Sequence, residues 1–496
     1  MKAKRNTIMR RSLALAGILA GTTLPFAATG PADAQAAVQT ISAADKAQGA
    51  KAHPQLLAEF GGAVSGRQAD YVVGVGRNIA VQSGLGNARS DFTVTLLNSP
   101  VNNAFAIPGG YVYTTRQLVA LMNNEAELAA VLGHEVGHVA ARHADKRQKQ
   151  ATRNSVIGVL GAVLSGVLLG DSQLGQLGQQ VFTQGSQLLT LRYSRSQETQ
   201  ADNLGITYLQ RAGYDPRAMS TVLQSLANQN ALEARLMGGT ANRVPEWAST
   251  HPDPASRVRA ALGKAGSNAR GNVNRDVFLS GVDGLMYGDD PRQGIVEGRN
   301  FTHPDLRFAF QAPNGFFLVN GTQSVTISGQ SGKGEFTGAA YSGDLEQYVR
   351  NAFAALSQGN QQTVAAPSIS RTTVNGIPAA YAAARAQTSG GQVDVVVFAY
   401  EFAKDQAFHF LTITAAGQAS TFNPMFSSMR RLNAGEAANV QPRRLQVVAV
   451  KAGDTIQSLA ARMAYTDMAL ERFLVLNGLA ANSTLQAGQK VKIVTY

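Results

Sequence analysis

The sequence predicts an α+β protein with three folded units: a mainly helical domain that holds a small sheet, a small α+β domain, and a short C-terminal module. The chain has 496 residues, more than one hydrophobic core normally serves. Apolar residues recur at helical spacing through most of residues 35–264, whereas they form strand-like runs within 300–432. Polar, turn-rich stretches at 265–299 and 435–442 predict linkers, which leaves residues 445–496 as the third unit.

Residues 1–34 predict an export signal. Five basic residues precede an apolar run that begins at Leu13, and small residues around Ala34 follow it as a cleavage site. An uncleaved membrane anchor is the alternative, although the apolar run is shorter than the ~20 residues that span a bilayer. In both cases we expect the rest of the chain to leave the cytoplasm.

The composition narrows the functions that we expect. Hydrophobic residues make up 44% of the chain and charged residues 15%, as in folded soluble proteins. The absence of cysteine excludes disulfides and thiolate metal ligands. The net charge is +12, and removal of residues 1–34, which carry five basic groups and one acid, leaves +8. For an exported chain this excess fits an anionic envelope surface and not a nucleic acid.

In the first unit, the segment Phe92–Thr115 alternates apolar and polar residues and is broken by prolines and glycines, which predicts a small sheet. Helices are expected from about Thr115 and from about Glu125, and a further helix ends at Gly213. The uncharged stretch 156–170 is short for a transmembrane helix. We expect either a buried helix or hairpin there, or a contact with a membrane surface.

The second unit combines strands with two helices. Residues 345–356 and 422–432 show helical spacing, and four apolar runs predict strands. These runs are LRFAFQ, FLVNGTQSVTISG, VDVVVFAYEF and AFHFLTIT. No motif in residues 300–432 points to chemistry, so their role stays open.

The stretch LGHEVGHVAARH, residues 132–143, predicts a metal site. On a helix, His134 and His138 differ by only ~40° in projection, so both imidazoles can bind one ion. Glu135 lies ~100° from His134, where a base can take a proton from water. The alternative is a chance H-E-x-x-H, which is rare in a chain with seven histidines. His143, ~180° from His134 on a continuous helix, is expected to be structural.

Two acids further along the chain complete the predicted site, because a zinc hydrolase needs three protein ligands and one open position. Glu198 and Asp202 are four residues apart on a predicted helix, and Glu198 is the best third ligand. Asp202 can accept the free N–H of a metal-bound imidazole and fix its tautomer. A solvated acidic helix face is the alternative for both residues.

Four motifs together resemble the HtpX and CAAX-prenyl-protease group of gluzincin metallopeptidases, and within it the periplasmic BepA-like members. The resemblance covers about residues 48–261. The motifs are NAFAIPGGYVYTT (103–115), ELAAVLGHEVGHVAARH (127–143), SRSQETQAD (194–202) and STHPDPASR (249–257). The resemblance implies a mainly helical gluzincin domain that binds one Zn²⁺ per chain.

By position, the resemblance assigns the zinc ligands to His134, His138 and Glu198. It assigns the general base to Glu135 and a helix partner of the metal helix to Asp202. The chain departs from the family in lacking both the transmembrane helices of the HtpX and CAAX-protease members and the helical repeats of the BepA-like ones. Partner recognition therefore cannot be copied from either subgroup.

Two further features follow from the same resemblance. His251 matches a histidine near the zinc that fills the open position or stabilises the oxyanion; a loop histidine bonded to its own backbone is the alternative. A substrate-binding edge strand is also implied, and an exposed edge can pair with any extended peptide. Its residues are Asn103, Ala104, Phe105 and Ala106.

The C-terminal unit, residues 445–496, resembles a LysM module. Its hallmarks are GDT (453–455), LNGL (476–479) and LQAGQKVKI (485–493). Such modules bind glycans that contain N-acetylglucosamine, so the resemblance implies peptidoglycan as a partner. A degenerate module retained for stability is the alternative, because one copy offers little multivalency.

We therefore expect a zinc-dependent endopeptidase in the periplasm of a Gram-negative bacterium, acting on unfolded or misassembled periplasmic and outer-membrane proteins. Membrane contact through residues 156–170 and peptidoglycan binding through residues 445–496 are both compatible with this prediction. A peptidoglycan peptidase is the first alternative. A non-enzymatic, glycan-anchored scaffold or chaperone is the second.

Overall fold

The computed structural model describes residues 39–146, 193–236, 251, 254–357, 368–388 and 391–496. The predicted export signal and the stretch 156–170 lie outside these ranges. Within the described ranges, no helix is both long enough and apolar enough to cross a membrane.

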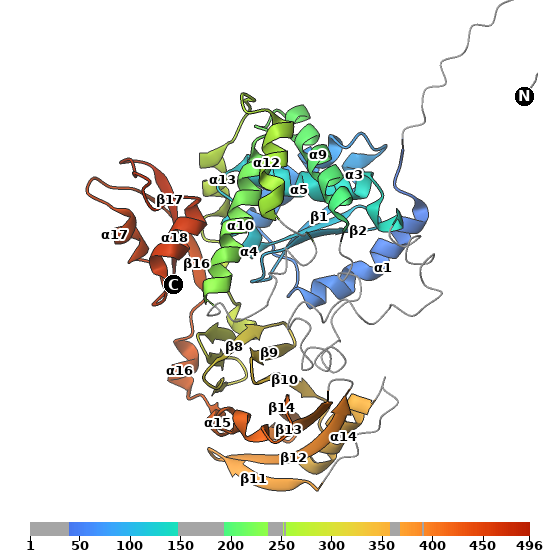
Figure 1. Cartoon of the computed structure of the whole chain (residues 1–496), viewed down its shortest axis with the longest axis vertical. Helices are drawn as coiled ribbons and strands as arrows, with labels where there is room; N and C mark the ends of the chain where they lie inside the picture. The colour runs from blue at the N-terminus through green and yellow to red at the C-terminus, as the bar shows by residue number, and fades with distance from the viewer. Residues whose placement is uncertain (1–38, 147–192, 237–250, 252–253, 358–367, 389–390) are drawn as a thin grey trace, which may run out of the picture. The chain divides into compact units, whose positions relative to one another are not determined.

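The first part of the chain is mainly helical and holds a three-stranded sheet (Figure 1). The strands are β1 (Thr93–Leu97), β2 (Ala104–Ile107) and β3 (Tyr111–Thr115). The helices are α1 (Ala43–Glu59), α2 (Arg67–Val81), α3 (Ala88–Asp91), α4 (Arg116–Leu121), α5 (Glu125–Ala140), α9 (Arg195–Arg211), α10 (Ala218–Leu236), α12 (Pro254–Ala265) and α13 (Arg275–Val282). The strand order β1-β3-β2 places β2 at an edge. The predicted sheet and the helices after Thr115 and Asn124, whose side chains cap them, are confirmed.

Helices α5 and α9 approach each other closely because small residues line their contact. Gly133 and Gly137 each precede one of the two motif histidines. A Cβ on Gly137 would lie 3.1 Å from the carbonyl oxygen of Ala201, and one on Gly133 would lie 3.4 Å from the Cα of Gly205. A glycine inside a helix costs about 1 kcal/mol relative to alanine. Here it lets the acids of α9 reach the histidines of α5.

The second part of the chain is sheet-rich and confirms the predicted α+β unit. A seven-stranded antiparallel sheet has the order β11-β12-β13-β14-β10-β9-β8, and a four-stranded sheet has the order β15-β7-β6-β5. Helix α14 packs on β12 and β13 (Figure 1). The elements are η1 (Pro291–Gln293), β5 (Ile295–Glu297), β6 (Asn300–His303), β7 (Phe308–Gln311), β8 (Phe316–Asn320), β9 (Ser324–Gly329), β10 (Gly332–Ala339), α14 (Leu345–Ser357), β11 (Ser370–Val374), β12 (Ile377–Thr388), β13 (Gly391–Ala403), β14 (Gln406–Ala415), η2 (Ala419–Phe422), α15 (Asn423–Ser428), β15 (Arg430–Arg431) and α16 (Ala434–Ala438).

Residues 265–299 are predicted to be a linker, but the structure shows folded elements there. Phe278, Leu279 and Val282 of α13 are buried in the same core as α5. Strand β4 (Met286–Tyr287) pairs with a strand of the C-terminal unit. The glycines and asparagines of this stretch therefore form turns between short elements, and those elements are too short to show a clear period in the sequence.

The C-terminal unit consists of a strand, two helices and a second strand: β16 (Arg443–Ala449), α17 (Ile456–Ala460), α18 (Ala469–Asn477) and β17 (Lys490–Thr495). It does not stand apart from the first part of the chain. Leu445, Phe473 and Val491 are buried in the core that contains α5. Helix α18 contacts both α4 and α10. The unit is therefore packed against the helical domain over an apolar surface.

Lys492 on β17 anchors this packing. Its side chain is fully buried, and its Nζ donates hydrogen bonds to the carbonyl oxygens of Ala120, at 2.8 Å, and Met122, at the end of α4. The last carbonyls of a helix lack partners within it, and a cation is favourable there. Burial lowers the pKa of Lys492 to about 7, while the charge of Glu127 on α5 acts in the opposite direction. Asn477, from the LNGL motif, binds the backbone N–H and carbonyl of Lys492.

Lys492→Met should lower the free energy of unfolding by about 3 kcal/mol, because it leaves helix carbonyls and Glu127 buried without their cation. Lys490→Met is the matched control: Lys490 lies on the same strand, is more exposed, and pairs with Asp276. It should change stability by less than about 0.5 kcal/mol. Denaturant unfolding followed by circular dichroism measures both, and equally small losses would contradict the anchoring role of Lys492.

Candidate metal centre

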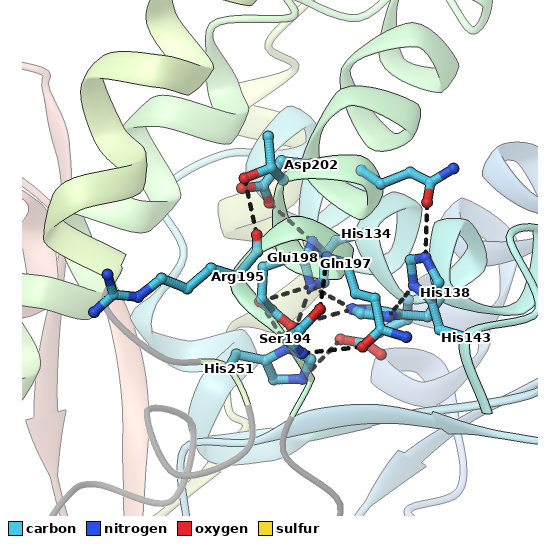
Figure 2. A network of polar contacts seen from close by, with 12 residues as sticks. His134, His138, His143, Ser194, Arg195, Gln197, Glu198, Asp202 and His251 are labelled. Atoms are coloured by element: carbon cyan, nitrogen blue, oxygen red, sulfur yellow. Dashed lines mark hydrogen bonds and ion pairs between the residues drawn. The ribbon is translucent and has the colours of Figure 1, made fainter. Parts of the chain in front are cut away.

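Four buried side chains from α5, from α9 and from just before α12 converge on one another (Figure 2). His134 and His138 come from α5, Glu198 from the first turn of α9, and His251 lies three residues before α12. Their ligand atoms all lie within 4.8 Å of one another. The Nε2 atoms of His134 and His138 are 3.0 Å apart, and Nε2 of His138 is 3.5 Å from Oε1 of Glu198. The structure thus brings together residues that lie more than a hundred positions apart.

A buried ion-pair network supports His134. Nδ1 of His134 is 2.9 Å from Oδ1 of Asp202, as the pairing of the two helices predicts. Arg257 of α12 donates to both oxygens of Asp202, at 2.8 and 2.6 Å, and lies 2.7 Å from Oε2 of Glu198. Burial alone would raise the pKa of Asp202, but the hydrogen bonds from Arg257 and His134 lower it to about 2. Asp202 therefore stays ionised and orients His134.

Sequence reasoning did not single out Arg257, Tyr193 or the true position of His143. Two signals could have identified Arg257: it belongs to the same motif as His251, and two acids buried together need a nearby cation. Tyr193 stacks on the ring of His138, with centroids 3.7 Å apart. His143 also contacts His138 instead of pointing away, because α5 ends before it.

Glu135 is fully buried beside the four converging side chains. Its carboxylate oxygens accept no hydrogen bond from the described part of the chain, and Oε1 lies 3.5 Å from Nε2 of His251. Burial raises the pKa of Glu135, while the charges of His251 and His134 lower it in part. A carboxylate with a raised pKa, held beside residues that could bind a metal, suits proton transfer near neutral pH.

The electrostatics of the cluster favour a cation. Burial lowers the pKa of His138 well below its ordinary value, so this imidazole is neutral and able to bind a metal. Burial would raise the pKa of Glu198, but the charge of His251 and its hydrogen bond to the carboxylate hold it far below its usual range. Burial lowers the pKa of His251, yet Glu198 and Glu135 raise it overall. The site thus attracts positive charge, and its set of imidazole nitrogens and a carboxylate oxygen fits zinc.

The predicted substrate strand lies at the edge of the small sheet. Asn103 directly precedes β2, which contains Ala104, Phe105 and Ala106 and pairs with β3. Ala106 and the next residue of β2 line a cavity together with His138 and Val139 of α5. The cavity is thus bounded by the end of β2 and by one residue of the metal cluster, His138.

Residues 67–265 match the family model described as Peptidase family M48, and residues 448–494 match the LysM domain model. The chain carries an M48 peptidase domain followed by a LysM domain. This finding confirms the resemblance that the four motifs indicated. All the converging side chains lie within the M48 match, and their donor set agrees with the zinc dependence of M48 peptidases.

Proteins of known name are similar to part of this chain. The beta-barrel assembly-enhancing protease of Yersinia pestis is 36% identical over 182 residues, which cover 36% of this chain and 35% of that protein. The protein of the same name from Escherichia coli (strain K12) is 33% identical over 182 residues, which again cover 36% of this chain and 35% of that protein. The mitochondrial metalloendopeptidase OMA1 of Arabidopsis thaliana is 34% identical over 202 residues, 39% of this chain and 36% of that protein. The matches thus cover about a third of the length of these relatives.

Proposed function

We propose that this protein is a zinc-dependent metalloendopeptidase. The observation that carries the proposal is the convergence of His134, His138 and Glu198 in a buried cluster, with the carboxylate of Glu135 beside it. The match to the M48 family and the protease names of the relatives support it. His251 is the fourth donor of the cluster in the resting protein.

The reaction is hydrolysis of a peptide bond by water. His134, His138 and Glu198 would hold a zinc ion, which would act as a Lewis acid on the peptide carbonyl and would lower the pKa of a water molecule. Glu135 takes the proton of that water at a carboxylate oxygen and delivers it to the nitrogen of the leaving amine. Asp202 and Arg257 keep His134 oriented throughout. The water attacks the peptide bond directly, so no acyl-enzyme forms.

The substrate is an extended polypeptide. Strand β2 lies at a sheet edge with which no other strand of the described residues pairs, and a peptide in β conformation pairs there with little regard to its sequence. A side chain of the peptide then enters the cavity beside His138. Unfolded or misassembled proteins expose such segments and folded proteins rarely do. The name of the beta-barrel assembly-enhancing proteases supports outer-membrane proteins as substrates.

The site of action is the periplasm, with peptidoglycan bound by the LysM domain. The predicted export signal and the LysM match support this location. The same LysM match favours one other function, a peptidoglycan peptidase, because the domain would bring glycan-linked peptides to the metal site.

Glu135→Gln should reduce hydrolysis of an unfolded protein by ~10²–10⁴-fold and leave zinc content unchanged, because it removes the base and spares the ligands. His134→Ala and Glu198→Ala should instead lose the metal. Peptide release and metal analysis of each variant are the measurements. A Glu135→Gln protein that keeps both its zinc and its activity would contradict the mechanism. Cleavage of purified muropeptides, without cleavage of protein, would support the peptidoglycan peptidase.

His251→Ala should still bind one zinc ion but release it faster to a chelator, because three of the four donors remain. The release rate in excess chelator, compared with wild type, tests this. Faster peptide hydrolysis by the variant would show that His251 blocks the open position of the resting enzyme. An unchanged release rate would contradict its place as a ligand.

The whole protein should sediment with insoluble peptidoglycan and be released by soluble oligomers of N-acetylglucosamine. Truncation is a poor test, since Lys492 and its neighbours are buried against the M48 domain. A salt series is the control, because adhesion through the net positive charge weakens above about 0.3 M salt whereas glycan recognition persists. Binding that salt abolishes and the oligomers do not would reject the LysM domain as a glycan-binding module.

A further inference from the structure

We propose that His143, backed by Gln200, is a positioning residue that fixes the tautomer and orientation of His138 for metal binding. The proposal rests on the metal site of the proposed function. It concerns a histidine that the sequence places outside the H-E-x-x-H motif and that helical projection turns away from the site.

Hydrogen-bond geometry carries the proposal (Figure 2). Nδ1 of His143 lies 2.8 Å from Nδ1 of His138, and Nε2 of His143 lies 3.0 Å from Oε1 of Gln200. The opposite nitrogen of His138, Nε2, faces the cluster, 3.0 Å from His134 and 3.5 Å from Glu198. His138 therefore offers Nε2 to the metal and has Nδ1 left for a partner.

These contacts dictate where each proton sits. A neutral imidazole that binds metal through Nε2 keeps its proton on Nδ1, so His138 donates to His143. His143 can accept a hydrogen bond at Nδ1 only if its own proton is on Nε2. That N–H donates to the side-chain oxygen Oε1 of Gln200. The hydrogen bonds thus run in one direction, from His138 through His143 to Gln200, and each ring nitrogen is either a donor, an acceptor or a metal ligand.

The backbone explains how His143 reaches this position. On a continuous helix it would project ~140° away from His138. Helix α5 ends at Ala140, and Arg142 adopts the left-handed conformation with φ of 55°. That conformation costs a non-glycine residue about 1 kcal/mol, and it turns the next side chain back toward the helix. Arg142 also forms an ion pair with Asp145 across this turn.

Burial makes the contact specific. His143 is fully buried, so water does not replace it as the partner of His138. Tyr193 stacks on His138 at an interplanar angle of 27°, whereas the rings of His143 and His138 meet at 71°. Tyr193 therefore limits tilting of the His138 ring, and His143 limits its rotation in the ring plane.

A neutral partner also suits the charge of the site. His134 already has a carboxylate partner in Asp202; Glu198 adds a second carboxyl group within the cluster, and Glu135 a third beside it. Among the described residues, Arg257 is the buried cation that pairs with Glu198 and Asp202. Another carboxylate beside His138 would add uncompensated buried charge. An imidazole and an amide orient the ligand without that penalty.

The test compares two substitutions of His143. His143→Asn keeps an acceptor oxygen near the position of Nδ1, whereas His143→Leu fills similar space without one. Competition with a chromophoric zinc chelator should show affinity reduced ~10–100-fold in His143→Leu and close to wild type in His143→Asn. The visible spectrum of the cobalt-substituted protein should change in the leucine variant and be restored by asparagine. Unfolding of the metal-free variants checks that both fold.

The outcomes separate this proposal from the proposed function. If wild type binds no zinc and hydrolyses no protein, the proposed function fails and this proposal fails with it. If wild type binds zinc and hydrolyses protein but His143→Leu has wild-type affinity and spectrum, only the role of His143 is overturned. Equal losses of affinity in the leucine and asparagine variants would likewise overturn it, because a packing residue gives no rescue by an acceptor.

Discussion

The close contact between α5 and α9 is the constraint on which the metal centre depends. Each helix carries two functional side chains four residues apart: His134 and His138 on α5, and Glu198 and Asp202 on α9. Two such pairs can meet only if the backbones approach closely, and the glycines of α5 allow this. A larger side chain at the contact would separate the acids from the imidazoles. The helix spacing thus sets the distances of the site before any metal binds.

Charge distribution is the second organising feature, because buried carboxyl groups outnumber buried cations among the described residues of the site. Arg257 neutralises Asp202 and contacts Glu198, which leaves Glu135 and the remaining charge of the cluster facing the histidines. Buried ionised groups without partners are strongly unfavourable. The site therefore carries excess negative charge. A divalent cation compensates this charge, and a proton on His251 compensates only part of it.

The parts of this site that follow local periodicity could be predicted from the sequence, and the others could not. The pairing of His134 with His138 and of Glu198 with Asp202 follows from helical geometry alone. His251 was found through family resemblance, since no spacing links it to α5. His143 was misplaced because nothing in the sequence marks Arg142 as left-handed, a conformation that usually needs glycine or asparagine. Residues 265–299 resemble a linker in sequence because α13 and β4 are short. Both elements depend on packing or pairing with other parts of the chain, which the local sequence does not reveal.

The LysM domain shares its hydrophobic core with the helix that carries the metal site, and this limits how the two can move. Lys492 reaches the end of α4, its charge interacts with Glu127 in the first turn of α5, and β4 extends the LysM sheet from within the preceding region. A domain joined only by a flexible linker would search a volume around its anchor. Here the buried contact leaves no such freedom. On the proposed function, an enzyme held to peptidoglycan in this way acts on polypeptides that come to it, which fits a site built to accept extended chains of any sequence.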